Sequence, residues 1–164
     1  MSLLIQYTIL YASVLILVAL GGCFSEHSGV INLGLEGIMV MGALGGALTM
    51  KYLEGSSPVT IVILTIIAAA VTGLVFSALL AVACINFKAD QTIVGTALNM
   101  LGLAAATVIV KAINTAENPD NVSATVQYIA QKKAFLVNIG DFTFNWMMLV
   151  ALVLLIAAYI VLYK

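Results

Sequence analysis

Charged side chains are scarce in this sequence, and arginine is absent. Asp, Glu, Lys and Arg together make up 8% of the chain, and its 6 basic residues are all lysines. An ordinary soluble domain carries about 25% charged residues. Nucleic-acid binding requires a dense basic face. The composition therefore excludes an ordinary soluble domain and gives no support for a nucleic-acid partner.

Cysteine and histidine are also rare, at 2 residues and 1 residue. Both Cys23 and Cys84 lie in or beside apolar runs, which indicates small hydrophobic side chains rather than a disulfide framework. The single His27 has no nucleophile motif beside it, and the sequence contains no P-loop and no zinc-protease motif. We therefore expect no enzyme activity, no cofactor and no metal site in this chain.

Apolar residues make up 63% of the chain and gather in runs of membrane-spanning length. A helix needs about 20 such residues to cross the hydrocarbon core of a bilayer. Because backbone groups in lipid must be paired internally, these runs should be helices. The predicted spans are residues 3–22, 30–50, 59–85, 92–110 and 146–163. The sequence thus predicts an all-α polytopic membrane protein with about five transmembrane helices.

One connection between the predicted spans is much longer than the others and covers residues 111–145. Loops of this length usually carry a function or a docking element. Its middle, residues 122–134, is mildly amphipathic, which favours a helix lying at the membrane surface.

The second apolar run begins with a polar stretch, S-G-V-I-N-L-G-L-E-G over residues 28–37. An ionisable group at the centre of a membrane helix costs about 2.5 to 3.5 kcal/mol, so Glu36 indicates a pathway, a proton site or a specific partner. Transporter sites are typically built from interrupted helices with polar groups facing a cavity. Asn32 and Glu36 are therefore candidates for a substrate pathway. We expect Gly34 and Gly37 to interrupt the helix.

A structural interpretation of the same residues stays open. Asn32 and Glu36 are four residues apart and would share one face of a helix. There they could form an interhelical hydrogen bond or cap the start of the helix, which would tune packing and not transport.

Small residues recur at helical spacing in the second and third runs. Gly42 and Gly46 stand four residues apart. The third run carries a ladder with the same spacing: Ala69, Gly73, Ser77 and Ala81. Because lipid supplies no hydrophobic drive between helices, spans associate through close approach at such residues. We expect these residues to form packing faces.

The fourth run carries a stripe of polar and small residues. Gln91, Gly95, Asn99 and Gly102 fall on one helix face, spaced four, four and three. This stripe should face protein or water rather than lipid. Gln91 and Asn99 are therefore two further pathway candidates, with interhelical hydrogen bonding as the alternative.

Two long motifs resemble those of a known family. The run L-V-A-L-G-G-C-F-S-E-H-S-G-V-I-N-L-G-L-E-G-I-M-V-M-G-A, residues 17–43, is similar to the signature of permease subunits of bacterial ABC importers of the ribose and branched-chain amino acid type. The run A-D-Q-T-I-V-G-T-A-L-N-M-L, residues 89–101, resembles the same family. The resemblance is to the nucleoside and simple-sugar branch that works with basic membrane protein lipoproteins, and it covers only that family's N-terminal half.

The resemblance implies that residues 1–164 form a single transmembrane permease domain, part of a translocation pathway for nucleosides or simple sugars. Implied partners are ABC ATPase subunits, which hydrolyse the ATP, a second permease subunit, an extracytoplasmic substrate-binding lipoprotein and the lipid bilayer. The implied location is the bacterial plasma membrane. The family's ATPase-docking loop would begin just after Lys164, so we expect a fragment or a truncated gene product.

Two interpretations from other classes stay open. The stretch ending at Cys23 resembles a lipobox, which would make the chain an acylated membrane lipoprotein. However, the N-terminus lacks the basic residues of a signal peptide. Alternatively, Glu36 could be the ion site of a proton-carrying or sodium-carrying subunit. Glu26 and His27 are expected to be solvated turn residues, with contact to the ATPase as the alternative.

Two arguments conflict on the orientation in the membrane. Four lysines fall on the side of the N-terminus and two on the other: Lys51, Lys111, Lys132 and Lys133 against Lys88 and Lys164. The positive-inside rule would then place the N-terminus in the cytoplasm. The resemblance implies the reverse, with residues 111–145 outside, where a binding protein could dock. We favour the resemblance because four lysines against two is a weak bias.

Overall fold

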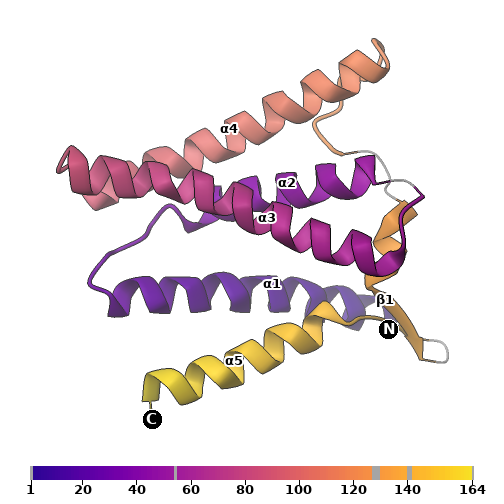
Figure 1. Cartoon of the computed structure of the whole chain (residues 1–164), viewed down its shortest axis with the longest axis horizontal. Coiled ribbons are helices and arrows are strands. Elements are labelled where there is room, and N and C mark those ends of the chain that lie inside the picture. The colour runs from indigo at the N-terminus through magenta and orange to yellow at the C-terminus, as the bar shows by residue number, and fades with distance from the viewer. Residues whose placement is uncertain (1, 54, 127–129, 140–141, 164) are drawn as a thin grey trace. The chain divides into compact units, whose positions relative to one another are not determined.

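The computed structural model describes the chain except for residues 1, 54, 127–129, 140–141 and 164, and it is predominantly helical (Figure 1). The α-helices are α1 (Ser2–His27), α2 (Leu35–Tyr52), α3 (Pro58–Ala81), α4 (Gln91–Glu117) and α5 (Met147–Tyr163). Each helix coincides with one of the predicted apolar runs. The prediction of an all-α polytopic membrane protein is therefore confirmed.

Within the described residues, three helical segments are long and apolar enough to cross a membrane: Leu4–His27, Pro58–Asn86 and Gln91–Glu117. Helix α5 is apolar but shorter, with 17 residues. Helix α2 has 18 residues and includes Glu36 and Lys51 among them, and it is not one of the three.

The chain forms two compact units. One unit comprises Met1–Val30 and Phe135–Lys164, and the other comprises Ile31–Ala134. We call the second the central unit, since it is the middle of the chain. It contains α2, α3 and α4, together with the stretch that leads into α2.

The other unit, Met1–Val30 with Phe135–Lys164, is called the terminal unit. In it, α1 packs against α5, where Ala151 and Ala158 are buried. Helix α5 follows an antiparallel hairpin of β1 (Leu136–Ile139) and β2 (Phe142–Asn145). The Asn145 side chain caps α5 by accepting a hydrogen bond from the Met147 backbone N–H at 3.0 Å. This hairpin was not predicted from the sequence.

The predicted surface helix over residues 122–134 is wrong. Residues 122–126 are not helical, and Ala130–Phe135 form only a short 3₁₀ helix. Residues 127–129 lie outside the described part of the chain. Helix α4 also continues to Glu117, so the loop begins at Asn118 and not at Lys111. Residues 111–117 of the predicted loop therefore belong to α4.

Helices α2 and α3 are antiparallel and approach closely through small residues. A Cβ added at Gly42 would lie 3.2 Å from the Ala69 carbonyl oxygen, and one added at Gly46 would lie 3.4 Å from the Thr65 methyl group. Gly73 faces Ile38 at ordinary contact distance. The predicted packing faces on the second and third runs are confirmed at these glycines and at Ala69.

Helices α2 and α4 run in the same direction, and α2 packs against both α3 and α4 (Figure 1). Near the start of α2, Gly37 lies against Leu98. Further along, Leu44 packs with Ala106 and Val110 in a buried cluster. The ends of α2 and α4 therefore coincide, which places Lys51 and Lys111 toward one end of the central unit and Lys88 at the other. Lys164 lies outside the described residues.

The turn between α3 and α4 sets where α4 begins. Helix α3 ends in a π-helical turn, Val82–Asn86. Lys88 then adopts a left-handed backbone conformation with φ of 52°. The Asp90 carboxylate caps α4 by accepting hydrogen bonds from Thr92 N at 2.9 Å and Ile93 N at 3.1 Å. This cap fixes the register in which Gln91 and Asn99 are presented.

Candidate functional site

The polar stretch ahead of α2 is not helical. Helix α1 ends at His27 and α2 begins only at Leu35. The Asn32 Oδ1 atom accepts a hydrogen bond from Gly34 N at 3.0 Å, an Asx-type turn that competes with helix formation. The expectation that Asn32 and Glu36 share one helix face is therefore wrong. We refer to residues 31–37 as the polar segment. It comprises the non-helical residues 31–34 and residues 35–37 in the first turn of α2.

Two side-chain amides of α4 bind the backbone of the polar segment. Gln91 Oε1 accepts a hydrogen bond from Ile31 N at 3.0 Å. Asn99 Oδ1 accepts one from Gly37 N at 2.8 Å, and Asn99 Nδ2 donates one to the Leu33 carbonyl at 2.7 Å. Non-helical backbone is tolerated at membrane depth only where protein or water satisfies it. Here the predicted stripe of α4 faces protein and supplies those partners.

Glycines of α4 allow the two backbones to meet. A Cβ added at Gly95 would lie 3.0 Å from Gly34 N, and one added at Gly102 would lie 2.7 Å from the Gly37 Cα. Both glycines of the polar segment are buried. Gly34 occupies the N-cap position immediately before α2. Gly37 lies inside α2, so its predicted role as a helix-breaking glycine is wrong, and its role is close approach to α4.

Glu36 differs from its neighbours because its side chain is exposed and makes no hydrogen bond or ion pair with any described residue. It lies in the first turn of α2, where the helix dipole favours a negative charge. The interhelical hydrogen bond considered for Glu36 is made instead by Asn99. Among the described contacts, the Asn32 side chain is bonded through its Oδ1 atom, whereas both carboxylate oxygens of Glu36 remain available to a ligand.

The other two predicted residues belong to the terminal unit. Glu26 and His27 are the last residues of α1 rather than turn residues, and both are exposed. The His27 Nδ1 atom lies 2.9 Å from the Cys23 carbonyl oxygen of the same helix. Cys23 is an exposed free thiol within α1.

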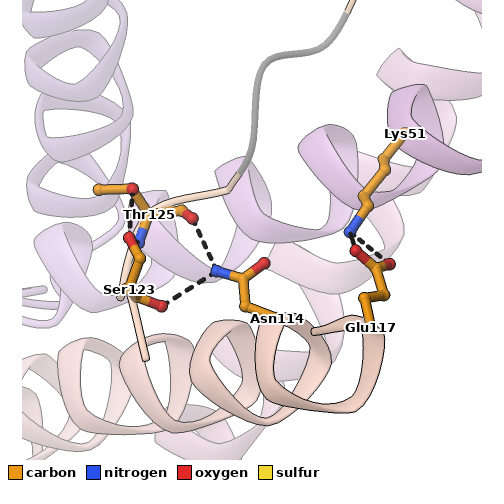
Figure 2. Close-up of polar contacts among 5 residues, drawn as sticks. All are labelled: Lys51, Asn114, Glu117, Ser123 and Thr125. Carbon is orange, nitrogen blue, oxygen red and sulfur yellow. Dashed lines mark hydrogen bonds and ion pairs between the residues drawn. The ribbon is translucent and has the colours of Figure 1, made fainter. Parts of the chain in front are cut away.

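A second polar cluster, at the other end of the α2–α4 pair, was missed by the sequence analysis. Figure 2 shows Asn114, which is 1% exposed, donating hydrogen bonds to the carbonyl oxygens of Ser123 at 3.0 Å and Thr125 at 2.9 Å. Beside it, Lys51 Nζ lies 2.6 Å from a carboxylate oxygen of Glu117. These contacts fasten the loop after α4 and join the ends of α2 and α4.

The signal for Asn114 was present in the sequence. The buried face of α4 continues past Gly102 at a spacing of four through Ala106, Val110 and Asn114. Because the predicted span ended at residue 110, Asn114 was assigned to the loop. Among the described residues, no group of three or more His, Cys, Asp or Glu side chains could hold a metal ion.

Comparison with known proteins identifies the class to which this architecture belongs. Residues 4–164 match the family described as "Branched-chain amino acid transport system / permease component". The chain therefore belongs to this family of transporter permease subunits. No solved structure matches it.

Three relatives indicate where in the family it falls. It is 43% identical over 122 residues to the guanosine ABC transporter permease protein NupQ of Bacillus subtilis, covering 74% of this chain and 38% of the relative. It is 36% identical over 101 residues to the nucleoside ABC transporter permease protein NupC of Lactococcus lactis, covering 62% and 32%. It is 38% identical over 103 residues to a putative glucose ABC transporter permease protein, TsgC13, of Haloferax volcanii, covering 60% and 28%. The matches thus cover less than two fifths of the length of these relatives.

Proposed function

We propose that this chain is part of the permease subunit of an ABC importer for nucleosides or simple sugars in a bacterial plasma membrane. The observation that carries the proposal is the polar segment, a non-helical stretch that leads into α2, with an exposed Glu36 that makes no described side-chain bond in the first turn, in a chain of the permease family. Interrupted helices with available polar groups are the typical material of transporter binding sites. ATP would be hydrolysed by separate ATPase subunits, because the sequence contains no P-loop.

The chemistry of Glu36 fits the substrates of the relatives. Guanosine, other nucleosides and glucose share hydroxyl groups and carry no net charge at neutral pH. A carboxylate is a strong acceptor for hydroxyl hydrogen bonds. Glu36 can therefore bind such a substrate through its hydroxyls. The orientation of the helix dipole stabilises the negative charge that this role requires.

An uptake experiment tests this proposal. The complete transporter, with its ATPase and binding protein, is expressed in cells that lack nucleoside uptake, and the entry of labelled guanosine and glucose is measured. We expect uptake of at least one, and a reduced rate in Glu36→Gln and Glu36→Leu. Glu117→Gln is the matched control, because the same chemical change falls at the other end of α2 and α4, and it should leave uptake unchanged. Full uptake by both Glu36 variants would remove Glu36 from the pathway.

We also propose that the loop after α4 faces the outside, where the binding protein docks. Residues 111–145 were assigned to that side from the family resemblance. Val122 is 70% exposed and therefore suits cysteine labelling better than the half-buried Ser123. Val122→Cys in a cysteine-free background should react with a membrane-impermeant maleimide in intact cells. Reaction only after permeabilisation, together with outside labelling of Ser28→Cys, would establish the opposite orientation.

A further inference from the structure

We infer that Asn99 is a positioning residue of the transport pathway, which fixes where α2 begins and so sets where Glu36 is presented. This inference rests on the proposed function, because it assigns Asn99 a role through Glu36. It also separates Asn99 from Glu36: both were pathway candidates by sequence, but the amide of Asn99 is already bound to backbone on both of its polar atoms.

The geometry of Asn99 carries the inference. In a continuous α-helix, the N–H of residue 37 would bond to the carbonyl of residue 33, four positions earlier. The Asn99 amide stands between these two groups, accepting from Gly37 N at 2.8 Å and donating to the Leu33 carbonyl at 2.7 Å. A side chain that inserts into this ladder interrupts the helix. Asn99 therefore replaces the hydrogen bond that would otherwise extend α2 backwards through the polar segment.

The surrounding contacts hold the polar segment in one conformation. Gln91 binds Ile31 N, and Asn32 binds Gly34 N within the segment. A glycine-rich stretch could instead be a flexible hinge. However, a Cβ added at Gly95 would lie only 3.0 Å from Gly34 N and 3.0 Å from Leu33 Cβ, and both glycines are buried. The glycines of this region thus serve close backbone approach, so the polar segment stays attached to α4.

The consequence for transport is specific. Glu36 lies one residue before the Gly37 amide that Asn99 binds, so loss of Asn99 removes the constraint on the first turn of α2. Asn99→Ala should change how Glu36 is presented without removing its carboxylate. Thr96 lies on the same helix and is exposed, and its hydroxyl donates to the carbonyls of Thr92 at 3.1 Å and Ile93 at 2.9 Å, both within α4. Thr96→Ala also removes a polar group from α4 but no hydrogen bond to the polar segment, so it is the matched control.

A double-mutant cycle in the complete transporter distinguishes positioning from general structural support. We expect Asn99→Ala to lower the uptake rate about five- to tenfold, the scale of losing two hydrogen bonds, and Thr96→Ala to leave it within about twofold. In a Glu36→Gln background, Asn99→Ala should cause no further loss, because its effect passes through Glu36. Losses that multiply in the double variant, relative to equal amounts of protein in the membrane, would overturn the inference.

Hydrogen exchange of the purified permease gives a second measurement that does not depend on transport. Peptides covering residues 31–38 should exchange faster in Asn99→Ala and at the original rate in Thr96→Ala, because only the first variant frees the Gly37 amide. Unchanged exchange in Asn99→Ala would refute the inference. An unsubstituted transporter that carries neither nucleosides nor sugars would instead refute the proposed function.

Discussion

Replacing Gly37 by alanine should destabilise the permease, although alanine favours helices. A Cβ at this position would lie 2.5 Å from the Leu98 carbonyl oxygen and 3.0 Å from the Asn99 Cα. These are backbone atoms and cannot rotate away. Ordinary contact begins at 3.4 Å, so α2 must move from α4 by 3.4 − 2.5 = 0.9 Å. Overpacking of this kind costs about 1 to 3 kcal/mol.

The shift also weakens the hydrogen bond between Gly37 N and Asn99 Oδ1, which holds the first turn of α2 against α4. Gly37 N lies 2.8 Å from Asn99 Oδ1, and a displacement of that size takes the pair beyond the usual limit of about 3.2 Å. Losing this bond adds about 1 kcal/mol. Gly37→Ala should therefore lower the free energy of unfolding by about 2 to 4 kcal/mol in total.

Gly73→Ala is the control for this prediction. It makes the same chemical change inside a helix, but its added Cβ would lie 3.8 Å from Ile38 Cγ2, an ordinary contact. Both variants gain the same helix propensity, up to about 1 kcal/mol, so their difference isolates the steric effect. The assay is thermal unfolding of the purified complete permease in detergent. A melting temperature for Gly37→Ala equal to that of Gly73→Ala would refute the argument.

The cluster at the other end of α2 and α4 yields two further predictions. Asn114→Leu removes the donor to the Ser123 and Thr125 carbonyls, so it should cost about 1 to 3 kcal/mol and speed proteolysis of the loop after α4; unchanged proteolysis would contradict this role. Lys51→Met removes the ion pair with Glu117, whose side chain is 40% exposed, so it should cost no more than about 1 kcal/mol. A loss above about 2 kcal/mol in thermal unfolding would show that this pair is stronger than an ordinary surface ion pair.

The helices and their contact faces were predictable because membrane helices obey strong local rules. Apolar length marks a span, and small residues at a spacing of four mark a contact. These rules located Gly42 and Gly46 against α3. They also placed Gln91 and Asn99 on the face of α4 that meets protein.

The start of α2 at Leu35, five residues later than the predicted run, was only partly predictable. Ile31 and Leu33 are apolar and fit a helix as well as an irregular segment, so the pattern placed Asn32 on a helix. What decides the conformation is Asn99, more than 60 positions later, whose amide binds the backbone of this segment. The residues around position 32 give no indication of that distant contact. The hairpin after residue 135 was missed for a different reason, because its strands have only 4 residues each and give too short a pattern to recognise.

The measurement that tests the central claim most directly is substrate protection of a cysteine at position 36. In the complete transporter, with Cys23 and Cys84 replaced by serine, Glu36→Cys should react with a water-soluble maleimide, and a transported nucleoside or sugar should slow that reaction. Leu74→Cys is the control, because Leu74 is 69% exposed on an apolar face of α3 that should meet lipid, and it should not react. If Glu36→Cys is unreactive, or reacts at the same rate with and without substrate, the polar segment does not line the pathway.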